Sequence, residues 1–485
     1  MLVAMLLLPL IAAALMVLAR PRALLELIHA LAALGGLASG LIVAVRVWRG
    51  EVPAAIGGLL RADGLSALMV VIITLLGAIA ALYGVGYIRA EYDDTHMARV
   101  RSFFGLFHLF IFTMLLAVTT DNLGIMWVAI EGTTLATAFL VNLHSTPRSL
   151  EAAYKYLILS SAGIALAFIG TVLMYYAGAS RAGEIAVNWT SLRAAASSLN
   201  PQVVRLAFVF ILVGYGTKAG LAPMHTWLPD AHSEAPAPIS ALMSGVLLNV
   251  GLYALMRFKT IADIAVGANF AGPWLVGIGL LSIAVAAVFL VRQRNYKRML
   301  AYSSVEHVGI ICMGLGFGGY WGVLGALLHV INHALSKSLM FLLSGNILLK
   351  YQTTDIRRVR GLLRASPLTA SAFAAGTLAL IGLPPFGPFI SEILIFRAGL
   401  ENGPVWVVVL GVALLVVAFA GMLSSVNQML YGAPPDKMEH GDVLRWSLAP
   451  LMVNFALLLA LGLTFPHAVA EALEQALRVL GVSHA

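Results

Sequence analysis

Cysteine and charge are both scarce in this chain. Cys312 is the one cysteine among 485 residues, so the chain cannot form an internal disulfide, an iron–sulfur cluster or a cysteine zinc site on its own. Charged residues make up 11% of the sequence, and no linker separates a soluble domain from the rest. These absences exclude a disulfide-stabilised secreted protein and a multidomain soluble enzyme.

Apolar residues dominate instead. They account for 60% of the sequence, and the mean hydropathy is +0.93. No soluble fold of this length can bury so much apolar surface, so the sequence predicts an all-α, polytopic protein of the lipid bilayer. The net charge of +8 is better explained by the positive-inside rule than by nucleic-acid binding.

Fourteen apolar runs are long enough to cross a membrane. They are 2–19, 24–47, 65–88, 103–120, 122–143, 156–177, 203–221, 239–258, 273–291, 300–317, 321–348, 367–397, 405–430 and 447–465. The tail from Pro466 is expected to form an interfacial amphipathic helix. Five acidic residues near the ends of runs are expected to be solvated loop charges: Asp63, Glu91, Asp93, Asp94 and Asp121.

Lysine and arginine are distributed unevenly between the two sets of loops. Eighteen fall on one side and ten on the other, while Lys218 and Lys337 lie within spans. The richer side should be cytoplasmic, which places both termini outside.

Two spans are interrupted. In the seventh span, Lys218 is followed by four prolines, the first at position 223 and the last at position 238. In the twelfth span, G-L-P-P-F-G-P at 382–388 is followed by Glu392. Paired interruptions predict two inverted five-helix repeats with broken helices 7 and 12. The expected divisions are an N-terminal three-helix part at 1–102, repeats at 103–260 and 261–431, and a C-terminal helix and tail at 432–485.

Ionisable side chains inside these spans are the candidate functional residues. Glu131, Lys218, Lys337 and Glu392 lie within apolar runs or beside the breaks. Such groups are costly in a membrane, so they mark ion pathways more often than static ion pairs. A carboxylate that approaches or leaves a buried lysine can switch the proton of that lysine, which is what a proton relay requires.

His329, His333 and Lys337 are spaced i, i+4, i+8 and should share one helix face. A histidine pair at i, i+4 is also a zinc pattern, but Val330 stands where H-E-x-x-H has its glutamate. We therefore expect no metal site; imidazoles beside a lysine favour proton transfer, and the alternative is hydrogen bonding between helices.

Further polar residues are candidates for access or gating. Lys297 is expected to anchor the interface by snorkelling, with a water link to the inner line as the alternative. Glu306 and His307 are the counterpart of Glu131 in the second repeat. The remaining candidates follow the first break, where the histidines either gate access or cap freed carbonyls: His225, Asp230, His232 and Glu234.

Several long motifs resemble one family, the antiporter-like proton-conducting subunits of respiratory complex I, Mrp antiporters and membrane-bound hydrogenases. They are G-T-K-A-G-L-A-P-M-H-T-W-L-P-D-A-H-S-E-A-P-A-P-I-S-A-L at 216–242, R-x-Y-K-R-M-L-A-Y-S-S at 294–304, H-x-x-x-H-x-x-x-K at 329–337 and L-P-P-F-G-P-F-I-S-E at 383–392. Within the family, 107–131, S-L-E-A-A-Y-K-Y at 149–156 and A-Y-S-S-V-E-H at 301–307 are most similar to the hydrogenase-4 component F branch.

The resemblance implies roles for the six main candidates. Glu131 and Lys218 look like the family's first glutamate–lysine pair, and Glu392 looks like its terminal site. The central relay is implied for His329, His333 and Lys337. Two departures are Ser244, where many relatives carry histidine, and Ser160 with Ser161, where some carry an acid.

The implied function is proton translocation in a bacterial or archaeal cytoplasmic membrane, driven by partner redox subunits. The partners would be other membrane subunits and peripheral nickel–iron or iron–sulfur subunits, since this chain should hold no cofactor. The alternatives are a cation/proton antiporter, with sodium in place of or against protons, and an ion-driven module for inorganic-carbon uptake.

Overall fold

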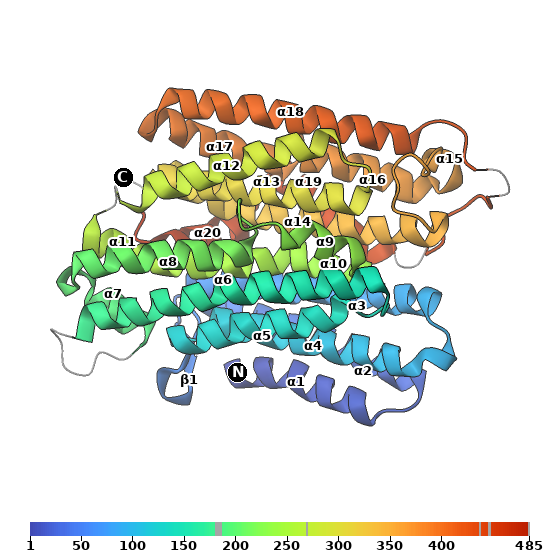
Figure 1. The fold of residues 1–485 in the computed structure, drawn as a ribbon. Coiled ribbons are helices and arrows are strands. Elements are labelled where there is room, and N and C mark those ends of the chain that lie inside the picture. Colours follow the sequence, from blue (N-terminus) through green and yellow to red (C-terminus); the bar gives the residue numbers. More distant parts are fainter. Residues whose placement is uncertain (180–186, 268–269, 436–437, 445–447, 484–485) are drawn as a thin grey trace.

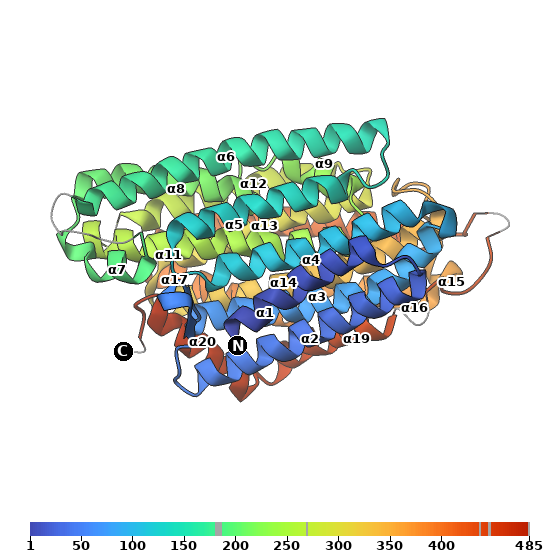
Figure 2. The ribbon, with the colours of Figure 1, turned by 90° about the horizontal axis from the view of Figure 1, so that it is seen from below.

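The computed structural model describes residues 1–179, 187–267, 270–435, 438–444 and 448–483. Its long helices run side by side along one axis and form a single elongated bundle (Figures 1 and 2). Three basic residues counted for the orientation, at positions 181, 437 and 445, and the start of the last predicted span at 447 lie outside the described residues.

The first half of the described chain contains α1 (Leu2–Leu18), α2 (Arg22–Trp48), β1 (Ala54–Ala55), β2 (Leu60–Arg61), α3 (Gly64–Glu91), α4 (Met97–Thr119), α5 (Leu123–Val141), α6 (Pro147–Ala179), α7 (Trp189–Ala194), α8 (Pro201–Ala219), α9 (Trp227–Glu234), α10 (Ala237–Leu242), the π-helical turn η4 (Met243–Leu247) and α11 (Leu248–Val266). The second half contains α12 (Ala271–Val291), α13 (Tyr296–Phe317), α14 (Gly319–Tyr351), α15 (Leu362–Ala365), α16 (Pro367–Leu380), α17 (Gly387–Asn402), α18 (Val405–Leu430), α19 (Leu448–Leu463) and α20 (His467–Val479). Short 3-10 turns are η1 (Ile56–Gly58), η2 (Asp94–His96) and η3 (Ala196–Ser198).

The architecture is helical, as predicted, apart from a short hairpin in which β1 pairs antiparallel with β2. Each of the fourteen predicted runs coincides with a helix or a broken pair. Among the described residues, eleven helices are long and apolar enough to cross a membrane, or twelve if the bent pair α19 and α20 is one span. The count of fourteen and the repeat boundaries stay predictions.

Both chain ends lie toward the end of the bundle that carries the hairpin and α7, whereas α15 lies at the opposite end (Figure 1). The two termini therefore share one side of the bundle, as the sequence predicts. Which side faces the cytoplasm stays a prediction.

The polar side chains are concentrated on shielded helices. The segment α10–η4–α11 and helices α13 and α14 are almost entirely buried, whereas α2, α6, α12 and α18 are largely exposed and present an apolar outer surface. A membrane protein buries its ionisable groups in this way because a charge facing lipid is costly. The central helices can therefore carry charge that the outer ring cannot.

Both predicted breaks are present. Helix α8 ends at Gly220, whose φ of +81° favours glycine and whose Cβ would lie 2.5 Å from Leu228 Cδ1. The second break separates α16 from α17 at Gly382, with φ +70°; a Cβ there would collide with the carboxylate of Glu392. The sequence did not predict the π turn η4, which follows the first break.

The tail forms the expected amphipathic helix. Helix α20 turns by 79° from α19. Its Leu473 and Leu477 are fully buried in the core, where α20 packs against α3 and α14, and Gln475 Nε2 donates to the Trp48 carbonyl at 2.9 Å. Its apolar face thus covers protein.

The expectation of solvated charges at span ends is wrong for Asp63 and Asp121. Asp63 accepts two hydrogen bonds from Arg257 at 2.6 and 2.7 Å, and Asp121 is 7% exposed and accepts from the Thr190 hydroxyl at 2.5 Å. Burial favours a higher pKa for Asp63, but its guanidinium partner holds that pKa below its ordinary value. The pair joins the start of α3 to α11.

Candidate functional site

A threonine joins the first glutamate and lysine. Lys218 Nζ, fully buried at the end of α8, donates to Thr134 Oγ1 at 2.7 Å, and Thr134 Oγ1 donates to Glu131 Oε2 at 3.2 Å. Thr134 and Glu131 lie one helical turn apart on α5 and therefore share a face. Within the described residues, Thr134 thus bridges Lys218 and Glu131, which form no direct ion pair.

Two more hydroxyls from α6 complete this group. Tyr156 OH accepts from Lys218 Nζ at 3.0 Å and bonds Thr137 Oγ1 at 2.7 Å. Ser161 Oγ donates to Glu131 Oε1 at 2.5 Å. The hydroxyls of Ser161 and Thr134 thus solvate Glu131, which is half-buried.

Serines connect η4 to the second lysine. Ser244 Oγ lies 2.7 Å from Ser304 Oγ on α13, and Ser304 Oγ also donates to the Leu300 carbonyl at 3.1 Å. Lys337 Nζ donates to the same carbonyl at 3.2 Å and to Ser303 Oγ. Ser244 therefore links η4, which follows the first break, to α13.

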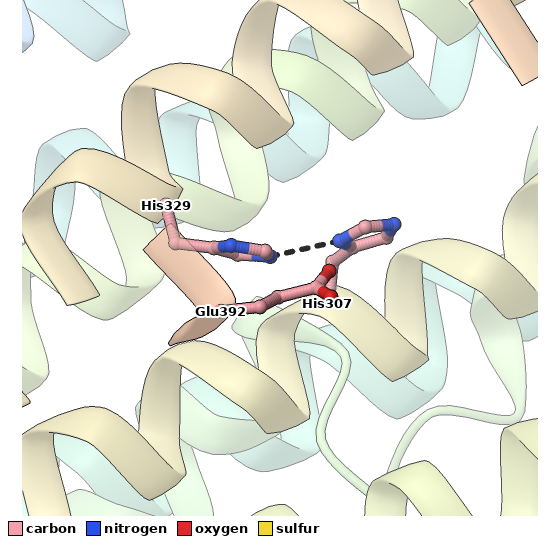
Figure 3. A group of neighbouring side chains, drawn as sticks. All are labelled: His307, His329 and Glu392. Atoms are coloured by element: carbon pink, nitrogen blue, oxygen red, sulfur yellow. Dashed lines mark hydrogen bonds between the residues drawn. The ribbon is translucent and has the colours of Figure 1, made fainter. Parts of the chain in front are cut away.

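Three helices bring the central histidines together. His329 and Lys337 share one buried face of α14 with His333, as the spacing predicts, and His307 reaches this face from α13. His307 Nδ1 lies 2.8 Å from His329 Nε2 (Figure 3). Glu392, from α17, lies beside both imidazoles.

Ser391 hydrogen-bonds the ring nitrogen of His329 that faces away from His307. Its Oγ lies 2.8 Å from His329 Nδ1, 3.1 Å from Asn332 Nδ2 and 2.9 Å from the Pro388 carbonyl. Because an amide nitrogen donates and a carbonyl accepts, Ser391 has one lone pair left for an Nδ1–H of His329. The break before α17 thus orients an imidazole on α14.

Two of the access candidates lie at a charged pocket near α6, α9 and α13. This pocket of about 220 Å³ is lined by Asp230 and Glu234 among other polar groups. Asp230 is paired with Arg298 and, at 3.3 Å, with Lys155. The prediction that Lys297 snorkels to the interface is wrong: it is 1% exposed and donates to the Ser233 and Ala235 carbonyls at 3.1 and 2.7 Å, where α9 ends.

The other gating candidates lie inside the protein. His225 is 6% exposed and contacts Tyr302, with ring centroids 6.1 Å apart. His232 is fully buried against Phe341, and neither of its ring nitrogens has a hydrogen-bond partner among the described residues. Glu306 is 8% exposed and precedes His307 on α13.

The sequence of this chain is similar to those of known membrane proteins. Residues 120–418 match the family model described as NADH:quinone oxidoreductase/Mrp antiporter, TM. The chain is 38% identical over 421 residues to a hydrogenase-4 component F homolog from Methylacidiphilum infernorum, covering 86% of this chain and 87% of that one. It is 34% identical over 380 residues to NADH-quinone oxidoreductase subunit N from Desulforudis audaxviator, covering 77% and 73%.

A solved structure shares the whole fold. A chain of the membrane-bound sulfane sulfur reductase, described as an archaeal respiratory membrane complex, superposes with a TM-score of 0.88 at 25% identity. The match covers 99% of this chain and 98% of that chain. The similarity therefore includes the N-terminal helices and the tail, which lie outside the matched family model.

Proposed function

Because this chain belongs to the NADH:quinone oxidoreductase/Mrp antiporter transmembrane family, we propose that it moves protons as the antiporter-like subunit of a membrane-bound redox complex. Relatives of this family are subunits of larger membrane assemblies. The chain is a polytopic membrane protein. The proposal concerns which residues carry the ion and what drives it.

The observation that carries the proposal is a set of titratable groups inside the helix bundle, several of which are joined by hydrogen bonds through hydroxyl groups. Glu131, Thr134 and Lys218 form its first part, and serines lead from η4 to Lys337. The second part contains His333 and ends in the group His307, His329 and Glu392. Ionisable groups inside a membrane are retained at a cost of several kcal/mol, about 2.5 to 3.5 on insertion scales, which favours a transport role.

Energy for transport would come from other subunits. We propose that this chain holds no redox cofactor of its own and that peripheral nickel–iron or iron–sulfur subunits supply the drive. A respiratory membrane complex contains the solved chain of the same fold. Affinity purification of the native complex, followed by mass spectrometry and metal analysis, tests this part; recovery of the chain without a redox subunit would contradict it.

The orientation follows from the loop charges. We propose a bacterial or archaeal cytoplasmic membrane with both termini outside, because the loops on the α15 side carry more lysine and arginine. Access of an impermeant reagent to a terminal tag in intact cells measures this directly. A tag that is labelled only after the cells are lysed would show that the termini lie in the cytoplasm.

The relay is tested by removing its titrating groups one at a time. We expect Lys218→Met and Glu392→Gln each to abolish proton uptake by inverted membrane vesicles, while partner redox turnover continues. Matched controls are Lys259→Met, which removes a lysine paired with Asp263 at 2.5 Å, and Glu401→Gln, which removes an exposed carboxylate on α17. An unchanged proton yield per electron in either relay variant would refute the proposal.

The same vesicles distinguish the alternative functions. Sodium-dependent proton flux without a redox donor would instead indicate a cation/proton antiporter. Co-purification with a soluble partner and dependence of carbon uptake on this chain would indicate an inorganic-carbon module. The redox proposal expects neither result.

A further inference from the structure

Three side chains from three helices form a ligand set that no single segment of the sequence contains. His307 on α13, His329 on α14 and Glu392 on α17 offer ligand atoms that all lie within 4.8 Å of one another (Figure 3). Two imidazoles and a carboxylate are a common protein ligand set for zinc. The third ligand that α14 lacks is thus supplied by its neighbours.

The hydrogen bonds around the two imidazoles favour a cation between them. His329 Nδ1 faces Ser391, which can accept its proton because Ser391 itself has the Pro388 carbonyl to donate to. His307 presents its Nδ1 to His329, so its Nε2 is the nitrogen left to carry a ring proton. When both outer nitrogens carry protons, two lone pairs face each other across 2.8 Å.

Facing lone pairs repel unless a cation lies between them. A proton satisfies them in transport, and a metal ion satisfies them equally, with Ser391 as the outer partner that orients His329. Glu392 supplies the negative charge. A slight separation of the rings accommodates the two metal–nitrogen bonds of about 2.0–2.1 Å.

His333 is a candidate fourth donor, and Glu392 is the least buried of the three ligands. The His333 ring centroid lies 5.6 Å from that of His307, and both His333 ring nitrogens lack hydrogen-bond partners among the described residues. Glu392 is only partly buried, beside the break where Gly382 has no Cβ to cover its carboxylate.

We propose that a borderline-soft divalent ion such as Zn²⁺ binds between His307, His329 and Glu392 and blocks proton transfer there. It acts as a reversible inhibitor and not as a resident cofactor. Imidazole ligands select Zn²⁺ over Mg²⁺ and Ca²⁺, which prefer all-oxygen sites. The blocking half of this inference rests on the proposed function, because it requires that these side chains carry protons; the binding half does not.

Binding is tested on the purified full-length complex in nanodiscs, with Co²⁺ absorption as a probe of coordination and Zn²⁺ calorimetry for affinity. We expect intense visible bands of tetrahedral Co²⁺, displaced by Zn²⁺ and unaffected by Mg²⁺. His307→Asn, His329→Asn and Glu392→Gln should each weaken Zn²⁺ binding at least tenfold. Ser391→Ala keeps all three ligands and should weaken it roughly ten- to hundredfold through lost orientation.

The control is a second buried histidine pair. His29 Nδ1 and His108 Nε2 face each other at 3.0 Å between α2 and α4, and that pair belongs to no three-ligand group among the described residues. His108→Asn should leave Zn²⁺ affinity unchanged. Each variant must elute as the wild-type complex before titration, so that a misfolded variant is not mistaken for a lost site.

The outcomes separate the two halves. Zn²⁺ affinity unchanged in the three ligand variants, or an octahedral Co²⁺ spectrum, would overturn the metal site while leaving the relay untouched. Binding that disappears in those variants, with transport undiminished at saturating Zn²⁺, would overturn the block and the relay role of these residues. Zn²⁺ binding that requires the three ligands, together with proton uptake that is lost at saturating Zn²⁺ in the wild-type complex, supports both.

Discussion

Replacing Thr134 by valine should separate Lys218 from Glu131 without changing either. The Thr134 hydroxyl is the one described group that contacts both side chains, at 2.7 Å from Lys218 Nζ and 3.2 Å from Glu131 Oε2. Valine has nearly the same shape, so the packing of α5 against α8 should persist. Lys218 would keep only Tyr156 OH as a side-chain acceptor.

The size of the effect follows from the bond that is lost. A hydrogen bond to a charged group contributes about 1.5–3 kcal/mol. At 1.4 kcal/mol per factor of ten, this corresponds to a roughly ten- to hundredfold slower transfer between the two groups. Because the step lies within the proposed path, proton uptake by inverted vesicles should fall by that factor while redox turnover changes far less.

Thr133 provides a matched control on the same helix. It is fully buried, and its hydroxyl donates to the Ile130 carbonyl of its own helix at 2.6 Å. Thr133→Val should therefore pump normally, and Thr134→Ser should retain activity because it retains the hydroxyl. Equal pumping by Thr134→Val and Thr133→Val would refute the idea that Thr134 couples the pair.

Two further predictions concern orientation and stability. Ser391→Ala should reduce proton uptake in the vesicle assay by about tenfold, because His329 loses the hydrogen-bond partner of its Nδ1. Ser391→Thr retains a hydroxyl and should restore most of the uptake. Equal uptake by the alanine variant and the wild type would show that Ser391 does not position His329. Arg257→Leu should destabilise the protein by about 3–5 kcal/mol, because Asp63 is left charged and largely buried, and it should clearly lower the thermal melting temperature in detergent. The control is Arg46→Leu, which removes an exposed ion pair with Glu51. Similar melting temperatures of the two variants would contradict this account.

The ionisable candidates could be predicted from the sequence because a charged group inside an apolar span carries a high free-energy cost. Glu131, Lys218, Lys337 and Glu392 interrupt apolar runs, and the histidine spacing on α14 was readable from the helix period alone. The glycines and prolines of the two breaks were readable for the same local reason. In the structure Lys218 and Lys337 are fully buried, whereas Glu131 and Glu392 are half-buried.

Hydroxyls could not be found in this way. Serine and threonine are common in membrane helices, where each satisfies itself on a carbonyl of its own turn. Thr133 and Thr134 are neighbours with the same side chain, and only the approach of α8 makes one of them a bridge. Asp63 was misread for a related reason, since its partner Arg257 lies 194 positions away along the chain.

The contact between Ser244 and Ser304 bears on direction. Each hydroxyl has one proton, and at 2.7 Å either can donate to the other; when Ser304 turns toward Leu300, Ser244 must supply the shared proton. A link that works equally well either way round imposes no polarity on what crosses it. We therefore expect the direction of net proton flow to be set at the two ends of the proposed path, by the partner subunits bound there.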